Sequence, residues 1–304
     1  MTDYGRALEF GSFITPAAGS ARGVMELTKA SERAGLDYAT FQDHPYQPAF
    51  FDTWTLLSYL AAQTSTIRLA ANVHNLPLRP PAVLARSAAS LDILSGGRIE
   101  LGLGAGGFWD AIEAMGGGRL TPGQSVTALS EAIDVIKGIW DAGNRERYVY
   151  EGEFYKINGA KRGPAPAHDM EIWLGGYKPR MLRLIGTKAT GWLPSLSYLP
   201  DLKELSVANA AIDQAALNAG RDPKVIRRLL NVGGQITNAP TSKPLVGPVQ
   251  QWIDDLVSMA LEHGMDTFIL GGDSVQMLEI YGNEIIPAVR EIVAQERGTN
   301  GLGA

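Results

Sequence analysis

The residues of this 304-residue chain that could do chemistry lie in two short stretches. Asp43 and His44 directly follow a strand-like run at 37–42. A histidine can take up or release a proton near neutral pH, and a neighbouring carboxylate can orient its ring. The second stretch runs Gly102-Leu103-Gly104-Ala105-Gly106-Gly107, and one face of it carries no side chains. Such a glycine row lets a ligand or another part of the protein approach the backbone closely.

Each stretch also has a purely structural interpretation. Asp43 could cap its loop, with His44 merely buried and hydrogen-bonded; the position and polarity of the pair favour function. The glycine row formally matches the dinucleotide motif G-x-G-x-x-G. However, it lies in the fourth strand–helix unit, and residues 123–127 offer no Asp or Glu to bind a ribose. Close packing of a helix on the strand therefore explains the row better than a dinucleotide site.

A third candidate is the glycine pair Gly175 and Gly176, which precedes Tyr177 and Lys178 at the expected start of a helix. Free backbone N–H groups at a helix N-terminus suit a phosphate group, and Lys178 adds charge. An ordinary tight turn is an equally good interpretation. His74 is expected behind or beside the site, and we assign no role to His168.

Strand-like and helix-like segments alternate along the whole chain. The expected strands cover 8–14, 37–42, 67–73, 98–104, 171–174, 191–194, 225–236 and 267–270. The expected helices cover 22–34, 53–63, 81–94, 122–141, 179–187, 202–219, 249–263 and 274–295. Eight strands, each followed by a helix, predict an α/β protein with the (β/α)8 TIM-barrel fold. A doubly wound sheet normally has fewer units and carries its glycine motif in the first one.

One segment, 142–170, does not fit this alternation. Its residues 147–157 place aromatic side chains on both sides of Glu151-Gly152, which is typical of a small hairpin. We interpret it as an insertion between units four and five. The chain is therefore predicted to form a single barrel domain over 1–296, followed by a frayed tail over 297–304.

Composition excludes several kinds of partner. The 27 basic and 32 acidic residues leave a net charge of −5 with no basic stripe, which argues against nucleic acid. With no cysteine there are no disulfides or thiolate metal sites, and the motifs of metal hydrolases are absent, so no metal is predicted. No apolar run is long enough to span a membrane, and residues 1–6 lead into no secretory signal. A cytoplasmic protein with a small-molecule substrate is expected.

From Phe10 to Val293 the sequence resembles the luciferase-like flavin and deazaflavin oxidoreductases. The densest resemblance is a series of motifs in a fixed order, with further support at 172–176 and 266–270. The series is Asp43-His44, Ile67-Arg68-Leu69-Ala70, Leu78-Arg79-Pro80-Pro81, Leu91-Asp92-Ile93-Leu94-Ser95-Gly96-Gly97-Arg98 and Leu101-Gly102-Leu103-Gly104-Ala105-Gly106. The fold of this family is also a (β/α)8 barrel, in agreement with the independent count of strands and helices.

The resemblance implies a tricyclic cofactor at the strand C-termini, either coenzyme F420 or FMN. The Asp43-His44 pair is similar to the F420 branch, where the matching histidine serves in proton transfer. A non-prolyl cis peptide bond is implied at Asn72–Val73. The remaining implied cofactor contacts are the turn Gly104-Ala105-Gly106-Gly107 and the segment Gly175-Gly176-Tyr177.

One departure from the family pattern concerns the reaction. In the sugar-phosphate dehydrogenase branch, a glutamate that donates a proton matches Gly107, and glycine cannot do this. The favoured hypothesis is hydride transfer with F420, in which His44 is the acid, base or polarising group and Asp43 orients it. The alternatives are an FMN-dependent monooxygenase and a non-catalytic flavin-binding protein. A homodimer is possible, and the substrate, contacted by loops at 108–120, 142–170 and 195–199, cannot be identified from the sequence.

Overall fold

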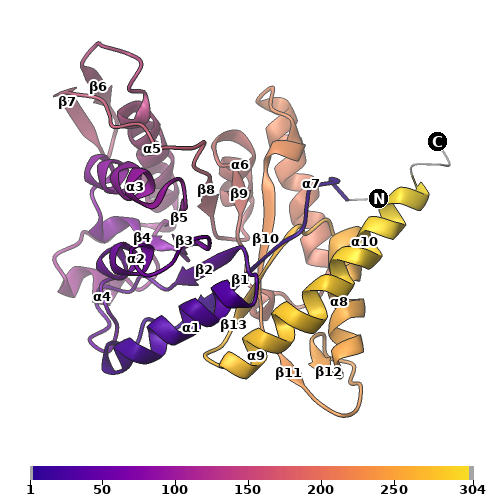
Figure 1. The fold of residues 1–304 in the computed structure, drawn as a ribbon. Helices are drawn as coiled ribbons and strands as arrows, with labels where there is room; N and C mark the ends of the chain where they lie inside the picture. Colours follow the sequence, from indigo (N-terminus) through magenta and orange to yellow (C-terminus); the bar gives the residue numbers. More distant parts are fainter. Residues whose placement is uncertain (1–2, 301–304) are drawn as a thin grey trace.

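Eight parallel strands close into a barrel in the computed structural model, which describes residues 3–300 (Figure 1). Each strand pairs with the next along the chain, and β1 pairs with β13 to close the ring. The barrel strands are β1 (Glu9–Ile14), β2 (Tyr38–Phe41), β3 (Arg68–Ala71), β5 (Ile99–Gly104), β8 (Ile172–Leu174), β9 (Gly191–Trp192), β10 (Arg227–Val232) and β13 (Thr267–Gly271). The predicted TIM barrel is confirmed.

Helices surround the barrel on its outer side (Figure 1). They are α1 (Ala21–Arg33), α2 (Thr53–Ala61), α3 (Pro81–Ser95), α4 (Trp109–Ala114), α5 (Pro122–Trp140), α6 (Pro179–Lys188), α7 (Lys203–Asn218), α8 (Val249–Leu261), α9 (Val275–Ile280) and α10 (Ile286–Asn300). Local signals set several of their ends. Asp52 caps α2 by accepting a hydrogen bond from the Thr55 amide at 2.9 Å. Thr121 and Gln124 form a reciprocal capping box at the start of α5.

The structure adds short elements that the sequence did not predict. Helix α4 lies in the loop after β5, and β4 (His74–Asn75) extends the sheet beyond β3 by pairing with β5. The strand expected over 225–236 is divided, because β10 ends at Val232 and Gln235–Ile236 form β11, which pairs in parallel with the unpredicted β12 (Val246–Gly247). All of these elements lie in loops after barrel strands, so they shape the end of the barrel where the candidate site lies.

The C-terminal helix differs from its prediction in two respects. The helix expected over 274–295 is interrupted by a π-helical turn at Tyr281–Ile285. The turn coincides with a close approach to α1, since a Cβ at Gly282 would overlap the Ala34 carbonyl oxygen.

The predicted frayed tail over 297–304 is also corrected in part, because α10 continues through Asn300. Arg297 holds this last turn: its guanidinium pairs with Asp3 at 2.8 Å and donates to the Arg6 carbonyl at 2.7 Å. Residues 301–304 of the predicted tail lie outside the described residues.

The segment after α5 contains the expected hairpin. Strands β6 (Tyr148–Glu151) and β7 (Lys156–Ala160) pair in antiparallel fashion and project beyond α5 (Figure 1). The Glu131 carboxylate of α5 accepts hydrogen bonds from the backbone amides of Glu153, Phe154 and Tyr155 at 2.8–3.1 Å. The hairpin is thus attached to the helix of unit four.

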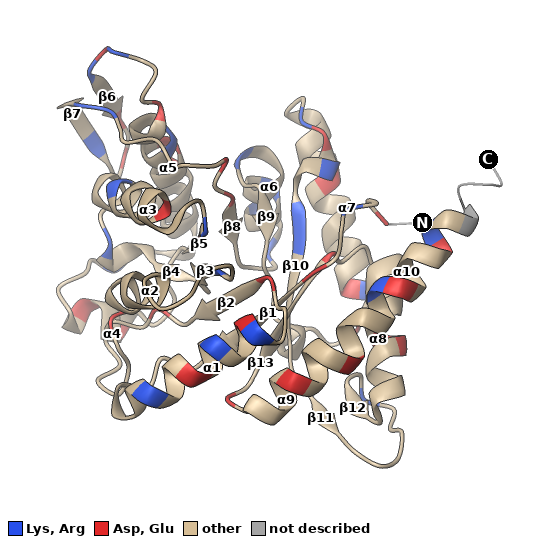
Figure 2. Ribbon diagram, in the orientation of Figure 1, with Lys and Arg blue, Asp and Glu red and all other residues tan. Residues whose placement is uncertain are grey.

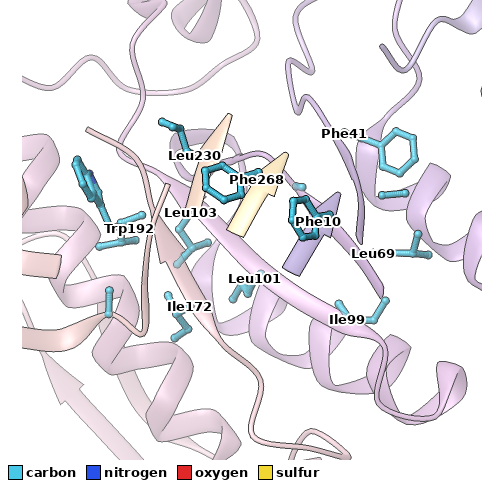
Figure 3. Packing of buried hydrophobic residues seen from close by; sticks show 14 of the residues in the cluster. Phe10, Phe41, Leu69, Ile99, Leu101, Leu103, Ile172, Trp192, Leu230 and Phe268 are labelled. Atoms are coloured by element: carbon cyan, nitrogen blue, oxygen red, sulfur yellow. The ribbon is translucent and has the colours of Figure 1, made fainter. Parts of the chain in front are cut away.

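The core has two layers because successive side chains of a strand point to opposite faces. Ile99, Leu101 and Leu103 of β5 join the larger layer between strands and helices (Figure 3). The smaller layer fills the barrel itself, where Tyr38 meets Trp173 edge-on at 5.2 Å. Gly102 and Gly104 therefore face the barrel interior, as the alternation with the three apolar residues predicted.

Charged residues fill the N-terminal end of the barrel. Arg227 pairs with Glu9 at 2.6 Å and with Glu171 at 2.8 Å, and Arg68 also pairs with Glu9 at 2.6 Å. Elsewhere basic and acidic residues are interspersed, as α1 and α10 show in Figure 2. Because the ion network lies at the opposite end of the strands from Asp43 and His44, its role is structural.

A pH-dependent contribution to stability is predicted at His168, which follows α5 and the hairpin. Its ring lies 3.0 Å from the Asp92 carboxylate and 3.4 Å from that of Glu100, and these contacts raise the pKa of His168 to about 10. A raised pKa means that the stabilisation is complete below the unfolded value of about 6.5 and is lost as the pH rises through about 10. Replacing His168 by Ala should cost about 1–2 kcal/mol at pH 6 in urea unfolding, given partial solvent screening. If His168→Ala lowered the free energy of unfolding equally at pH 10, this pH dependence would be contradicted.

The glycine row gives a second stability prediction. A Cβ at Gly102 would overlap the Ala71 carbonyl oxygen and lie 3.2 Å from a Val73 methyl group. Gly102→Ala is therefore expected to destabilise the protein by roughly 1–3 kcal/mol, because backbone cannot move aside cheaply. Gly118→Ala is the matched control, since a Cβ there meets no atom within 4 Å. Equal thermal midpoints for the two variants would refute the close contact.

Candidate active site

A pocket of about 360 Å³ opens at the C-terminal ends of β2, β4, β5 and β8. Nearly all of the predicted site residues line it, although they come from four separate strand–loop units. The lining residues are Asp43, His44, Tyr46, Asn72, Val73, His74, Asn75, Gly104, Ala105, Gly106, Gly107, Phe108, Gly175, Gly176 and Met181. Tyr177 is the exception: its hydroxyl is hydrogen-bonded to the backbone of Ser195 instead.

Asp43 is buried and serves as an anchor for the wall of the pocket. Its carboxylate accepts two hydrogen bonds from the Arg79 guanidinium, at 2.6 and 2.7 Å, and one from the backbone amide of Asn75 at 2.9 Å. The His74 ring lies 3.3 Å away. Burial alone would raise the pKa of the Asp43 carboxyl, but the hydrogen bonds from Arg79 and His74 hold it well below its usual value. Asp43 is therefore a carboxylate at any physiological pH.

The predicted role of Asp43 in orienting His44 needs correction. No hydrogen bond joins the two side chains among the described residues, because the carboxylate is already occupied by Arg79, His74 and a backbone amide. A bidentate guanidinium is a stronger partner for a carboxylate than a neutral imidazole. Asp43 thus acts on His44 only through its charge, which favours the protonated ring.

His44 lies at the mouth of the pocket between two aromatic rings. It stacks on Tyr46 at 5.1 Å and meets Phe108 edge-on at 5.2 Å. Burial lowers the pKa of His44 below its usual value, and the Asp43 charge opposes that effect only in part. The Gln42 amide nitrogen lies 3.3 Å from Nε2. Since an amide nitrogen only donates, Nε2 accepts and the proton of the neutral ring resides on Nδ1.

Gly102 and Gly104 of the glycine row bring two parts of the protein close together. At Gly102 the neighbour is the Ala71 carbonyl, and at Gly104 a Cβ would lie 2.7 Å from a Val73 methyl group. The expected helix packing is wrong here, because the neighbour is the segment between β3 and β4. The Asn72–Val73 peptide bond in that segment is cis, as the resemblance implied. Of the four glycines at 102, 104, 106 and 107, Gly107 alone would hold a Cβ with no atom within 4 Å, so the turn faces open space at that position.

Three buried polar atoms of the pocket residues have no hydrogen-bond partner in the described part of the chain. They are His74 Nε2, Asn75 Oδ1 and Tyr46 Oη. The side chains of Tyr46 and Asn75 are neighbours, since contact with Asn75 acts to lower the pKa of Tyr46. His74 is fully buried, and burial lowers its pKa, so the ring is neutral with Nδ1 toward Asp43. An unpaired buried polar atom costs about 1–3 kcal/mol, so these residues are candidates for contact with a polar ligand.

Sequence reasoning missed Arg79, Tyr46, Asn75 and Phe108. Phe108 directly follows the glycine turn and is 62% exposed, so an aromatic residue after an open turn was an available signal. The next residue, Trp109, packs against Gly106. Nothing local marked Arg79 as the partner of Asp43, since the two residues lie 36 positions apart.

Across the barrel mouth, Asn72 after β3 and Asn231 of β10 form a reciprocal amide pair. Nδ2 of Asn72 donates to Oδ1 of Asn231 at 2.7 Å, and the return bond is 3.1 Å. Asn231 also donates to the Ser195 hydroxyl at 3.2 Å. A second pocket of about 640 Å³ begins beyond this pair, and Asn231 and Ser195 line it. The only sequence signal for a polar contact here was a single asparagine, Asn231, in the otherwise apolar C-terminal half of β10.

Two kinds of site were not found among residues 3–300. No group of three or more His, Asp or Glu side chains is arranged to hold a metal ion there. No helix in the same part of the chain is both long and apolar enough to cross a membrane.

The candidate site lies at the C-terminal ends of the strands, which is where barrel enzymes carry their active sites. A family model described as luciferase-like monooxygenase matches residues 8–242. The chain therefore belongs to the luciferase-like family.

Curated relatives include two 5,10-methylenetetrahydromethanopterin reductases. The protein from Methanolobus tindarius is 35% identical over 203 residues, covering 67% of this chain and 58% of the relative. That from Archaeoglobus fulgidus is 32% identical over 195 residues, covering 64% and 54%. A phthiodiolone/phenolphthiodiolone dimycocerosates ketoreductase from Mycobacterium sp. (strain JLS) is 33% identical, covering 60% and 47%. The chain thus matches only about half of the length of these relatives.

Solved structures share the fold over nearly the whole chain. An F420-dependent secondary alcohol dehydrogenase with an F420-acetone adduct has a TM-score of 0.81 at 16% identity, covering 93% of this chain and 99% of that one. The coenzyme F420 dependent tetrahydromethanopterin reductase from Methanopyrus kandleri has a TM-score of 0.76 at 21% identity, with the same coverage. A type II Baeyer-Villiger monooxygenase component from Pseudomonas putida, in complex with FMN, has a TM-score of 0.72 at 19% identity, covering 93% and 98%.

Proposed function

We propose that this protein is an oxidoreductase that binds coenzyme F420 in the 360 Å³ pocket and exchanges hydride with a small organic substrate. The observation that carries the proposal is one pocket at the C-terminal ends of the strands, where His44, the open Gly107 turn and the Gly175–Gly176 turn lie together. The F420-dependent relatives favour this cofactor over FMN.

The residues present fit a planar, polar cofactor with an anionic tail. His74 Nε2 and Asn75 Oδ1 are acceptors, and Tyr46 can donate, so together they match hydroxyl and amide groups of a ligand. Helix α6 begins at Pro179 without a side-chain cap, and the Gly175–Gly176 turn precedes it. Its free N–H groups suit the phosphate of the tail, and Lys178 adds a positive charge.

When bound, the cofactor supplies or accepts the hydride, and the protein supplies position and electrostatics. Tyr46 and Phe108 confine the His44 ring at the mouth of the pocket. Neutral His44 can donate the proton on Nδ1 or take up a proton on Nε2 after release from Gln42. Asp43 and Arg79 hold the β4 segment, which carries His74 and Asn75, in place at the wall of the pocket. Gly107 leaves the turn open and supplies no acid.

The alternative is an FMN-dependent monooxygenase, and the structural likeness to an FMN-bound enzyme supports it. A non-catalytic flavin-binding protein is the third hypothesis, supported by the lack of an acid at Gly107. Titration of the purified protein with F420 and with FMN, followed by fluorescence, distinguishes these proposals. We expect micromolar F420 binding and at least tenfold weaker FMN binding; the reverse order would overturn the proposal. Tyr46→Phe should weaken F420 binding by roughly fivefold, since one hydrogen bond is worth about 1 kcal/mol.

We also propose that the protein is cytoplasmic and, given the family, a homodimer. Light scattering during size-exclusion chromatography measures the oligomeric state directly.

A further inference from the structure

The second pocket, of about 640 Å³, lies at the C-terminal ends of β1, β9, β10 and β13. We propose that it binds the substrate, and that the substrate has an uncharged carbonyl or hydroxyl head and an apolar body. The inference rests on the proposed function, because it assigns the first pocket to the cofactor. It goes further by naming the residues that select the substrate and the chemistry they select.

We assign the polar head of the substrate to the point where the cofactor pocket and the second pocket meet. Asn72 lines the cofactor pocket and Asn231 lines the second one, and their amide pair joins the pockets at the mouth of the barrel. Ser195 accepts a hydrogen bond from Asn231, so its own hydroxyl proton can be donated to a ligand oxygen. A parallel bridge between Ser195 and Asn231 holds the two backbones in register. A neutral oxygen is the natural partner of such neutral donors.

The body of the pocket is apolar. Beyond Asn231 it is lined by hydrophobic side chains from two loops and two strands. These are Phe13, Leu196, Leu199, Leu202, Val232 and Pro244. The charged lining residues, Asp201 and Lys243, are both exposed, so they lie at the solvent side of the pocket. Because a buried charge needs a buried partner, a carboxylate or phosphate on the substrate would be disfavoured in the interior.

The reaction balances for a ketone and its alcohol. The carbonyl carbon takes a hydride from the reduced deazaflavin and its oxygen takes one proton, which forms the alcohol. The deazaflavin is oxidised by two electrons in the same step. In the opposite direction the alcohol releases the hydride to the oxidised deazaflavin and one proton to a base.

Saturation-transfer NMR on the cofactor-free protein tests the pocket with three named probes: 2-heptanone, 2-heptanol and heptanoate. We expect the ketone and the alcohol to bind at least tenfold more tightly than the carboxylate. Leu196→Trp should fill the pocket and weaken ketone binding at least tenfold. Asn231→Ala should weaken it about fivefold, the loss of one hydrogen bond. This milder variant serves as the test should the tryptophan variant fail to fold.

Leu94→Trp is the matched control. Leu94 is 84% exposed and lines a groove of about 600 Å³ between α2 and α3, which is similar in size and also apolar. This variant should leave ketone binding unchanged. The inference is overturned if heptanoate binds as well as the ketone, if no probe binds, or if only Leu94→Trp reduces binding. F420 binding without ketone binding refutes this inference alone, whereas ketone binding without F420 binding refutes the proposed function.

Discussion

Replacing Asp43 by Ala is expected to destabilise the protein by about 3–5 kcal/mol, the cost of leaving a buried charge without its partner. The side chain of Asp43 is 1% exposed, and that of Arg79 is 16% exposed. Without the carboxylate, the Arg79 guanidinium loses two hydrogen-bond acceptors and the backbone amide of Asn75 loses one. Exposed Asp52, which also contacts Arg79 at 2.6 Å, compensates little because solvent screens it. Urea unfolding monitored by circular dichroism measures the loss.

The control for this prediction is Glu26→Ala. Glu26 pairs with Arg33 on the surface of α1, and both side chains are more than half exposed. Loss of this exposed ion pair should lower the free energy of unfolding by about 0–0.5 kcal/mol. If Asp43→Ala cost no more than Glu26→Ala, the buried pair would not hold the pocket wall. Asp43→Ala should also weaken F420 binding, because the wall carries His74 and Asn75.

Replacing His44 by Ala is expected to lower the rate of hydride exchange by about 10²–10⁴-fold, the usual contribution of a positioned acid or base. The ring lies at the mouth of the pocket and is kept neutral by burial, so it can exchange protons near neutral pH. The rate is measured with whichever probe ketone or alcohol reacts, from the absorbance of oxidised F420. Cofactor affinity should change by less than tenfold, because the unpaired polar atoms belong to other residues.

His263→Ala is the matched control for the histidine. His263 lies after α8 and contacts Ser206 at 3.0 Å, away from the pocket, so its loss should leave the rate unchanged. A His44→Ala variant that binds cofactor normally and retains the full rate would exclude the proposed role. The pH dependence is a further readout. The wild-type rate should change at a pH below the usual histidine value, since burial lowers the pKa of His44, and this feature should vanish in the variant.

Much of the fold was predictable because it depends on neighbours in sequence. Ile99, Leu101 and Leu103 alternate with Glu100 and Gly102, and this period of two defines both faces of β5. Asp52 and Thr121 act on amides three residues away, so helix starts were also readable. The Asn72–Val73 cis bond came from the family resemblance rather than from any local pattern.

The site was predictable in position but not in its contacts. The rule that barrel sites lie at strand C-termini placed His44, the Gly107 turn and the Gly175–Gly176 turn in one pocket. The rule could not identify partners, so Asp43 was assigned to its neighbour in sequence, His44. Asp43 pairs with Arg79 instead, because a bidentate guanidinium is a stronger partner for a buried carboxylate than a neutral imidazole ring.

The sequence by itself determined the eight-unit barrel, the family and the end of the barrel that carries the site, because each follows from short-range patterns. Only the tertiary structure decided what occupies the glycine row and what Asn72 contacts. Asn72 and Asn231 are 159 residues apart, and they meet only after the strands close into a ring in one register. Closure of the ring is a property of all eight strand pairings together, so no single stretch of sequence encodes that contact or the second pocket beyond it.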